Sequence, residues 1–330
     1  MSSNSRSLKY SRAINEAFVQ LMTADPSVFI IGQGVKSPWY VGQTCAGLID
    51  QFGETRVIDT PVSENAMTGA AVGAAIAGMK AVSVHPRMDF ALYGLDPVIN
   101  EAANWHYMFG GAASVPVVVW GIINRKGEQG AQHSQALHAM FAQIPGLKVV
   151  APATPYDAKG LMVAAINDPN PVIFVDDRWL YDFEDDVPEE LYESEIGKAQ
   201  VLKQGTDLTI VTSSYLTQES LKAAAILADS GVDVEVLDLR TIKPLDVPAI
   251  LASVRSTGRL LAIDGGWRSF GVAAEIVAVV SEEAFEVLKS PVRRLTLPDL
   301  PAPASRSLED PYYITSESIV EVVKSMLNVN

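Results

Sequence analysis

Residues 59–78 read DTPVSENAMTGAAVGAAIAG and join a short apolar strand to a helix. The strand spans Arg56 to Ile58, and the helix, Ala66 to Ala77, consists almost wholly of Ala, Gly and Val. Because this helix has no polar face, we expect it to be buried. Glu64 opens the helix, and desolvating its carboxylate is unfavourable unless another group pairs with it. We therefore expect Glu64 to meet a ligand; the alternative is an acid that only stabilises the helix start.

The first half of the sequence alternates between short strands and helices. Runs rich in Val and Ile are typical of buried strands in a parallel sheet. We expect such strands at Val28–Ile31, Ala81–Val84, Val115–Trp120, Lys148–Ala151 and Val172–Asp176. We expect further helices at Ser11–Thr23, Val98–Phe109 and Pro155–Asn167. This alternation predicts an α/β fold whose sheet is covered on both faces.

A second, smaller α/β unit follows an acidic stretch. Residues Trp179 to Glu195 are acidic and weakly patterned, which favours a solvated linker over a binding tail. Beyond it we expect strands at Leu208–Thr212, Val234–Leu237, Leu260–Ile263 and Val292–Leu297. Helices are expected at Thr217–Ser230, Asp246–Arg255, Phe270–Val280 and Glu317–Leu327. The domains are therefore predicted to span residues 1–190 and 191–330.

Composition narrows the class of protein. A chain of 330 residues with 48% hydrophobic residues is long enough for one large or two medium soluble domains. The net charge of −14 argues against nucleic acid as a partner. Cys45 is the single cysteine, which excludes an internal disulfide and fits the reducing cytoplasm. Met1–Lys9 lacks the apolar core of a secretory signal, and we expect a frayed terminus there.

Several motifs that would define other chemistries are missing from the sequence. There is no GxGxxG after a strand, no Walker loop, no HExxH and no GxSxG. The four histidines are too scattered to predict a zinc site. The chain also lacks a Gly-Asp-Gly sequence followed at a distance by Asn.

One candidate segment is Gln132-His133-Ser134-Gln135, which follows the glycine-bearing loop Gly127–Gly130. That loop comes after the predicted strand Val115–Trp120, and ligands bind at the carboxyl ends of parallel strands. A histidine there can transfer protons near pH 7. The alternative is a loop histidine that caps the next helix.

Another candidate segment, His85 to Phe90, directly follows the predicted strand Ala81–Val84. His85 and Arg87 are candidate substrate contacts, because Arg87 can hold a substrate anion. Arg87 can equally pair with Asp89 at the surface. Phe90 is either a core residue or a platform for a ligand ring.

Taken together, these segments resemble a known family in order along nearly the whole chain. The resemblance rests on Asp59–Gly78, Asp96–Glu101, Gln132–Gln135, Ile144–Pro152, Asp157–Gly160, Leu237–Asp246, Asp264–Trp267 and Phe270–Gly271. They look like the β-subunit of the thiamine-diphosphate-dependent first component of 2-oxo-acid dehydrogenases. This resemblance implies two α/β domains. The first is a pyrimidine-binding domain with a mainly parallel sheet, and the second is a smaller transketolase C-terminal domain.

The resemblance also implies roles for residues. Glu64 matches the glutamate that hydrogen-bonds the aminopyrimidine ring of the cofactor. A buried acid has a raised pKa, and donation to the ring nitrogen favours the imino tautomer that deprotonates the thiazolium carbon. Phe90 and Val62 match residues that bind the cofactor, and His133 matches a histidine beside the substrate. A structural potassium site is implied at Val117, Ala165, Ile166, Asp168 and Asn170.

The missing Gly-Asp-Gly…Asn element implies a partner. In two-subunit members of the family it lies on the α-subunit, where it holds magnesium and the cofactor diphosphate. This chain is therefore expected to complete its active sites in an α2β2 heterotetramer, with Gly69–Gly78 as a candidate packing surface. A lipoyl acyltransferase is a further expected partner.

The expected reaction is decarboxylation of a 2-oxo acid with transfer of the acyl or aldehyde unit. Val84 replaces the acid usual in pyruvate-type members, and Asn124-Arg125-Lys126 is also unusual, so the particular 2-oxo acid stays open. A split transketolase that moves a two-carbon ketol unit between sugars is the second hypothesis, because Arg87, Arg125 and Lys126 can hold a phosphate. A non-catalytic regulatory subunit is the third; the presence of Glu64, Phe90 and His133 argues against it.

Overall fold

The computed structural model describes residues 5–329, which form two compact units. Unit 1 contains the chain up to Arg125 together with Met140–Ile196, and unit 2 contains Lys126–Ala139 together with the chain from Gly197. The units therefore divide at residues 196/197 rather than 190/191. The short segment Lys126–Ala139 also groups with unit 2, although it lies within the sequence of unit 1.

Unit 1 is built on a parallel sheet with the strand order β6-β7-β5-β4-β2-β3. Its strands are β2 (Val28–Gly32), β3 (Val57–Asp59), β4 (Lys80–His85), β5 (Val117–Ile123), β6 (Lys148–Val150) and β7 (Val172–Asp177). All of the strands expected from the Val- and Ile-rich runs are confirmed. Their parallel pairing confirms the α/β prediction for this unit.

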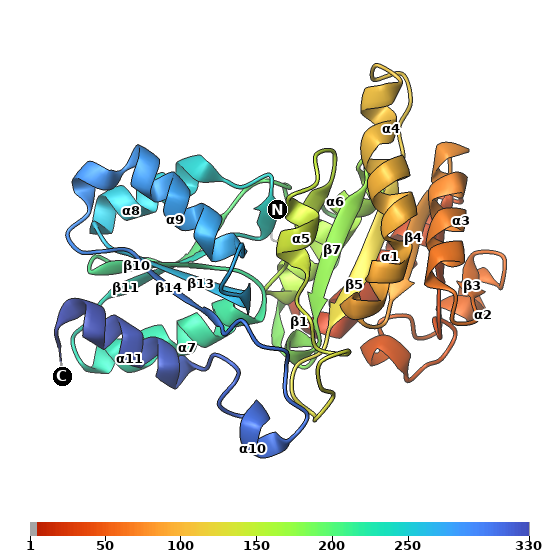
Figure 1. Ribbon diagram of the computed structural model, residues 1–330. Coiled ribbons are helices and arrows are strands. Elements are labelled where there is room, and N and C mark those ends of the chain that lie inside the picture. Colours follow the sequence, from red (N-terminus) through yellow and green to blue (C-terminus); the bar gives the residue numbers. More distant parts are fainter. Residues whose placement is uncertain (1–4, 330) are drawn as a thin grey trace. The chain divides into compact units, whose positions relative to one another are not determined.

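Helices cover both faces of this sheet (Figure 1). The helices are α1 (Tyr10–Ala24), α2 (Leu48–Phe52), α3 (Glu64–Ile76), α4 (Ala103–Met108), α5 (His138–Ala142) and α6 (Pro155–Asn167). On one face, Val117 of β5 joins a core with Met67 and Val72 of α3. On the other face, Trp120 of β5 packs against Phe18 of α1, with 5.5 Å between ring centroids. Short 3₁₀ helices complete the unit at η1 (Tyr40–Gln43), η2 (Met88–Gly94) and η4 (Arg178–Leu180), together with the π-helical segment η3 (Pro97–Ala102).

Helix α3 is only half buried in this chain, which corrects the expectation that it would be buried all round. Met67, Ala71 and Ala75 face the sheet, whereas the opposite side is exposed. The exposed residues include Ala70 and Gly73, and a Cβ added at Gly73 would meet nothing within 4 Å. An apolar helix face left open in this way is typical of a subunit contact.

The acidic stretch after β7 is not a solvated linker, and Ser5–Lys9 is not frayed. Strand β1 (Ser5–Lys9) pairs antiparallel with strand β8 (Glu184–Pro188), so both segments belong to unit 1. Buried Lys159 of α6 adds a second tie, because its Nζ donates to Glu16 and to the carbonyl oxygens of residues 188, 189 and 190. The charge pattern of the sequence predicted neither the pairing of β1 with β8 nor the hydrogen bonds of Lys159. Met1–Asn4 lie outside the described residues.

A buried carboxyl group lies at the end of β7. Asp176 is fully buried, and its Oδ2 accepts hydrogen bonds from Trp120 Nε1 at 2.9 Å and from Tyr181 Oη at 2.8 Å. Burial raises the pKa of Asp176 to about 7, because desolvation disfavours the carboxylate. The native state therefore binds this proton more tightly than the unfolded chain.

We expect Asp176→Asn to stabilise the protein at pH 8 and to have little effect near pH 4. The stabilisation from the protonated native carboxyl is fully present below the unfolded pKa of about 3.9 and is lost as the pH rises towards 7. The raised pKa corresponds to a loss of at most about 4 kcal/mol in the free energy of unfolding as the carboxyl group ionises. The amide of the variant keeps an oxygen that can accept a hydrogen bond from Trp120 or Tyr181. Thermal unfolding followed from pH 4 to 8 tests this, with the exposed Asp186→Asn as control. A variant less stable than wild type at pH 8 contradicts it.

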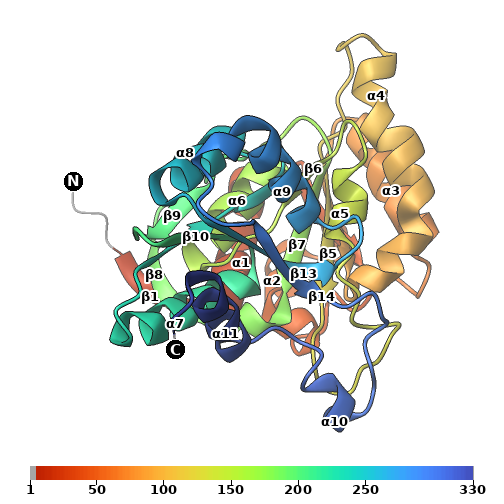
Figure 2. The ribbon, with the colours of Figure 1, turned by 60° about the vertical axis from the view of Figure 1, so that its left-hand side comes forward.

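Unit 2 is a five-stranded sheet with the order β14-β13-β10-β11-β9. Only β9 pairs antiparallel. Helices α7 and α11 cover one face and α8 and α9 the other (Figure 2). The strands are β9 (Gln200–Lys203), β10 (Leu208–Thr212), β11 (Val234–Asp238), β13 (Leu260–Trp267) and β14 (Arg293–Leu297), with β12 at Thr241–Lys243. The helices are α7 (Tyr215–Asp229), α8 (Val247–Thr257), α9 (Val272–Glu283), α10 (Arg306–Glu309) and α11 (Ser316–Leu327), with η5 at Phe285–Val287.

Each strand and helix expected for the second domain is confirmed within a few residues. Among the helices of the described residues, none combines the length and the hydropathy that a bilayer-spanning segment needs.

Candidate cofactor site

An open pocket of about 690 Å³ lies in unit 1, beside the carboxyl ends of three neighbouring strands. Gln33 directly follows β2, Val62–Asn65 connect β3 to α3, and Phe90 follows β4. The lining residues are Gln33, Val62, Ser63, Glu64, Asn65, Phe90 and Tyr93. This edge of a parallel sheet is where ligands bind in open α/β folds. The pocket thus brings together Glu64, Val62 and Phe90, which the sequence had singled out separately.

Glu64 supplies an acid to this pocket from the first turn of α3. It is half-buried, and the positive end of the helix dipole lies beside its carboxylate. The preceding Ser63 makes no side-chain capping hydrogen bond to this helix. A carboxyl group so placed can accept or donate a hydrogen bond to a ligand in the pocket.

The pocket has an aromatic wall. Phe90 and Tyr93 lie three residues apart on the 3₁₀ helix η2, and three residues make one turn of such a helix. Both residues therefore face the pocket, with Val62 as a third apolar group. A flat heteroaromatic ring fits such a wall, with its polar edge towards Glu64.

Four of the lining residues were not predicted to belong to the site: Gln33, Ser63, Asn65 and Tyr93. The position of Gln33 just beyond a predicted strand was a usable signal. No comparable signal existed for Tyr93, because the 3₁₀ helix that aligns it with Phe90 was not predicted.

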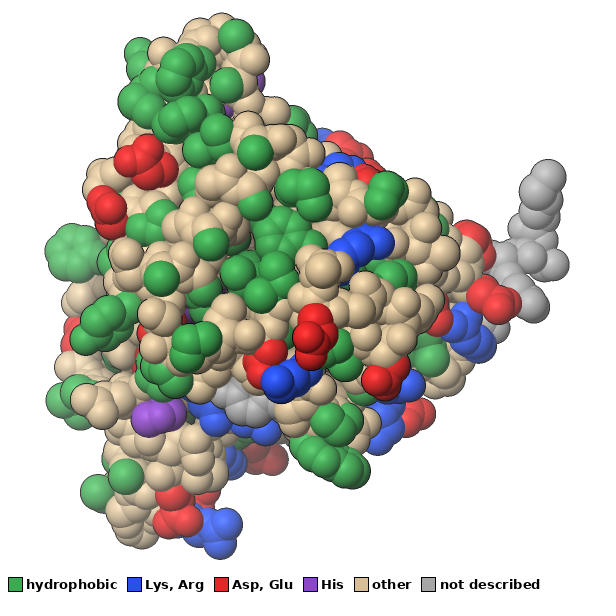
Figure 3. Space-filling view, turned by 90° about the vertical axis from the view of Figure 1, so that its right-hand side faces the viewer, with side chains coloured by type: hydrophobic (Ala, Val, Ile, Leu, Met, Phe, Trp, Pro, Cys, Tyr) green, Lys and Arg blue, Asp and Glu red, His purple; other side chains and the backbone are tan. Residues whose placement is uncertain are grey.

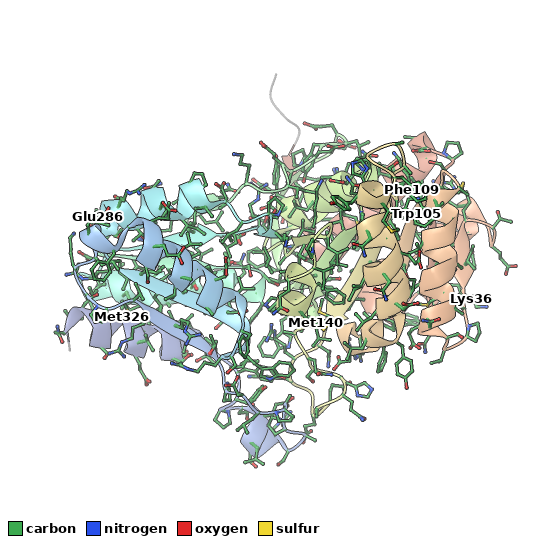
Figure 4. All side chains as sticks on the ribbon, turned by 45° about the horizontal axis from the view of Figure 1, so that its top comes forward. Lys36, Trp105, Phe109, Met140, Glu286 and Met326 are labelled. Atoms are coloured by element: carbon green, nitrogen blue, oxygen red, sulfur yellow. The ribbon has the colours of Figure 1, made fainter. Side chains whose placement is uncertain are left out.

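The loop after Gln33 is tied to β3. Asp59 Oδ1 accepts a hydrogen bond from the Gly34 backbone N–H at 2.5 Å, and its Oδ2 lies 3.5 Å from Lys36 Nζ. Gly34 has a φ of 75°, which favours glycine at this turn. Figure 4 labels Lys36, whose side chain is largely exposed. Asp59 thus fixes the loop that carries one wall of the pocket.

His85 and Arg87 do not line the pocket. Strand β4 continues to His85, so this side chain is buried in the core, with Nε2 3.2 Å from Thr68 Oγ1. Burial lowers the pKa of His85 to about 4, so the ring is neutral. Arg87 is half-buried and donates from Nη1 to the Pro86 carbonyl at 2.7 Å. The strand end was predicted one residue too early, which hid the inward direction of His85.

His133 belongs to unit 2. It lies in the segment Lys126–Ala139, is half-buried, and its backbone N–H donates to the Gly130 carbonyl at 3.3 Å. The pocket described above is formed by unit 1 alone.

The residues expected at a potassium site surround the end of α6. Ala165 and Ile166 are in its last turn, where carbonyl oxygens lack partners within the helix, and Val117 begins β5. Asp168 accepts from Lys148 Nζ and, through Oδ1, from the Asn170 backbone N–H at 2.9 Å. Asn170 Oδ1 is buried and has no hydrogen-bond partner within the described residues. The described residues hold no cluster of three His, Cys, Asp or Glu side chains suited to a metal.

Family models match both units. Residues 6–183 match the transketolase pyrimidine-binding domain, and residues 197–319 match the transketolase C-terminal domain.

Relatives align along almost the whole chain. The chain is 41% identical over 333 residues to the acetoin:2,6-dichlorophenolindophenol oxidoreductase subunit beta of Cupriavidus necator, covering 98% of both chains. It is 40% identical over 314 residues to the pyruvate dehydrogenase E1 component subunit beta of Rickettsia felis, covering 95% of this chain and 96% of that one. It is 40% identical over 332 residues to the mitochondrial pyruvate dehydrogenase E1 component subunit beta of Saccharomyces cerevisiae, covering 99% of this chain and 91% of that one.

A solved structure described as a split gene transketolase, inactive beta4 tetramer, shares the fold. The TM-score is 0.78 at 21% identity, with 98% of this chain and 99% of that chain covered. Both domain matches and the full-length identities agree with the resemblance seen in the sequence. The chain therefore belongs to the family of β-subunits of the thiamine-diphosphate-dependent 2-oxo-acid dehydrogenase first component.

Proposed function

We propose that this chain is the β-subunit of a two-chain enzyme that decarboxylates a 2-oxo acid and transfers the resulting acyl or aldehyde unit. The observation that carries the proposal is the pocket in which Glu64 lies beside the Phe90, Tyr93 and Val62 wall. This set suits the aminopyrimidine ring of thiamine diphosphate, which offers flat faces and a polar edge. When bound, the cofactor supplies a carbon nucleophile and an electron sink.

The residues of the chain have distinct proposed tasks. Glu64 holds and moves the proton at the pyrimidine ring nitrogen. Phe90 and Val62 pack on the ring and fix its angle to Glu64. His133 transfers a proton at the substrate. Arg87, which lies outside the lining of the pocket, holds the substrate carboxylate and no part of the cofactor ring. His85 is left out of the proposed contacts because its side chain is buried.

The remaining cofactor contacts are proposed to come from an α-subunit, because this sequence lacks the Gly-Asp-Gly…Asn element for magnesium and diphosphate. Hydrophobic side chains gather at the top of the face in Figure 3, where Figure 1 places α4. Tyr107, Met108 and Phe109 are 88%, 55% and 52% exposed there. Figure 4 labels Trp105 and Phe109 at this end of α4, and their ring centroids are 4.8 Å apart.

These exposed groups and the open side of α3 support an α2β2 assembly, because monomeric proteins rarely expose such patches. A lipoyl acyltransferase as acceptor and a cytoplasmic location complete the proposal. A potassium ion at the end of α6 is also proposed, held by the carbonyls of Val117, Ala165 and Ile166 with Asp168 and Asn170. The buried Asn170 Oδ1, for which the described part of the chain supplies no hydrogen-bond partner, supports this site.

The function is tested with the purified α–β complex and a panel of substrates. We expect release of carbon dioxide from a 2-oxo acid, with pyruvate and branched-chain acids as the first candidates. Acetoin belongs in the panel because one similar relative is named for it. Turnover of ketose phosphates without any 2-oxo-acid turnover would support a split transketolase instead. A complex that binds the cofactor and turns over neither class would support a regulatory subunit.

A further inference from the structure

The segment Lys126–Ala139, which carries His133, is tied to unit 2 near both ends by buried carboxylates distant in sequence. Near its start, the Glu128 backbone N–H donates to Glu309 Oε2 at 3.1 Å. At its end, His138 Nε2 lies 2.7 Å from Asp264 Oδ1. His133 lies midway, five residues from each tie.

The contact between His138 and Asp264 is buried. The side chains of His138 and Asp264 are 6% and 3% exposed. Asp264 also accepts hydrogen bonds from the Gly266 N–H at 2.9 Å and from the Val272 N–H at 2.8 Å, where α9 begins. Burial opposes ionisation of Asp264, but its charge interaction and hydrogen bond with His138, together with the backbone N–H groups of Gly266 and Ala273, hold its pKa below the usual range. Backbone N–H groups of β13 and α9 therefore hold the Asp264 carboxylate in the position where it contacts His138.

The tie to Glu309 acts on a strained loop. Lys126 and Glu128 have φ angles of 55° and 59°, in the left-handed region that non-glycine residues rarely adopt. Such a backbone persists only where surrounding contacts hold it. Glu309 of α10 is 2% exposed and accepts from the Glu128 N–H, and Asp310 lies 3.8 Å from Lys126 Nζ.

We propose that Asp264, through His138, and Glu309, through the Glu128 backbone, are positioning residues that fix the His133 imidazole for proton transfer. This inference rests on the proposed function, because it assigns His133 a proton-transfer role. None of the three side chains is proposed to touch substrate or cofactor. Groups that transfer protons require this kind of support, since small displacements from the productive geometry slow the reaction.

The test uses paired variants of the α–β complex. His138→Ala and Glu309→Ala remove the ties. His138→Gln keeps a donor at the distance of Nε2, and Glu309→Gln keeps an acceptor for the Glu128 N–H. We expect each alanine variant to lower kcat by about 10²-fold with KM little changed. Proton exchange at the thiazolium carbon should stay normal, and each glutamine variant should recover most of the rate. Asp299→Asn, an exposed carboxylate in unit 2, is the control.

A double variant separates positioning from general stability. His133→Ala combined with His138→Ala should be no slower than His133→Ala alone, because a positioning residue has nothing to position once His133 is gone. A further multiplicative loss, or glutamine variants as slow as alanine, would overturn the inference. If His133→Ala keeps full kcat, the proposed role of His133 is wrong and the inference fails with it. Should the alanine variants fail to assemble, His138→Asn, whose amide is too short to reach Asp264, takes their place.

Discussion

Glu64→Gln is expected to slow proton exchange at the thiazolium carbon of the bound cofactor by about 10²–10⁴-fold, the range for loss of a positioned acid–base group. Among the described residues that line the pocket, Glu64 is the one with a carboxyl group, so none of these neighbours can take over its role. The amide keeps the size and the hydrogen bonding of the side chain but does not exchange a proton with the ring nitrogen. Fold and assembly should therefore be unaffected.

The measurement is exchange of the thiazolium proton for deuterium in the α–β complex, followed by quenching at successive times. Glu54→Gln is the matched control, because Glu54 is exposed and lies before β3. Retained thermal stability and cofactor affinity in Glu64→Gln would show that the loss is chemical. Exchange at the wild-type rate would mean that Glu64 only stabilises the start of α3, the alternative that its position in the first helical turn allows.

The strands and helices were predictable because hydrophobic periodicity reports burial within the chain. The β10 strand, Leu208–Thr212, and α6, Pro155–Asn167, agree with the prediction residue for residue. Pairing that depends on distant partners left no such pattern. Strand β8 is mostly acidic and exposed, and only its hydrogen bonds to β1 define it as a strand.

For the pocket too, residues could be predicted where local sequence identifies them and not where they depend on distant contacts. Glu64 and Val62 were predictable because their segment matches the family, and Phe90 because it closely follows a predicted strand and matches a cofactor-binding residue of the family. Tyr93 depends on the 3₁₀ geometry of η2, so its place in the pocket does not follow from local sequence. Gln33 could have been found from its position directly after a predicted strand, although the loop that follows it is held by Asp59. The exposed face of α3 was mispredicted for a similar reason. The apolar composition of the helix indicates that another surface covers it, but not whether that surface belongs to the same chain.

We expect the isolated chain to bind thiamine diphosphate weakly and to turn over no substrate, and the α-subunit to restore both. In the described part of the chain, the pocket of unit 1 has a ring wall and one acid, but no positively charged lining residue for a diphosphate. Titration of the α-subunit against a fixed amount of this chain, with cofactor affinity and carbon dioxide release as readouts, measures the effect. Full activity of the isolated chain would contradict the division of the site between two chains.

We expect Gly73→Leu to prevent assembly with the α-subunit while leaving the fold of this chain intact. Gly73 is exposed on α3, and a Cβ there meets nothing within 4 Å. Gly is less favourable than Ala in a helix by about 0.8–1 kcal/mol, and Leu ranks just after Ala. The isolated variant should therefore be at least as stable as wild type. If α3 packs closely against the α-subunit, the added side chain must prevent that approach, so α-subunit binding and activity should both be lost. Ala225→Leu, on the exposed side of α7, is the control for an added leucine. Normal assembly of Gly73→Leu would place the subunit contact elsewhere, with the exposed end of α4 as the next surface to test.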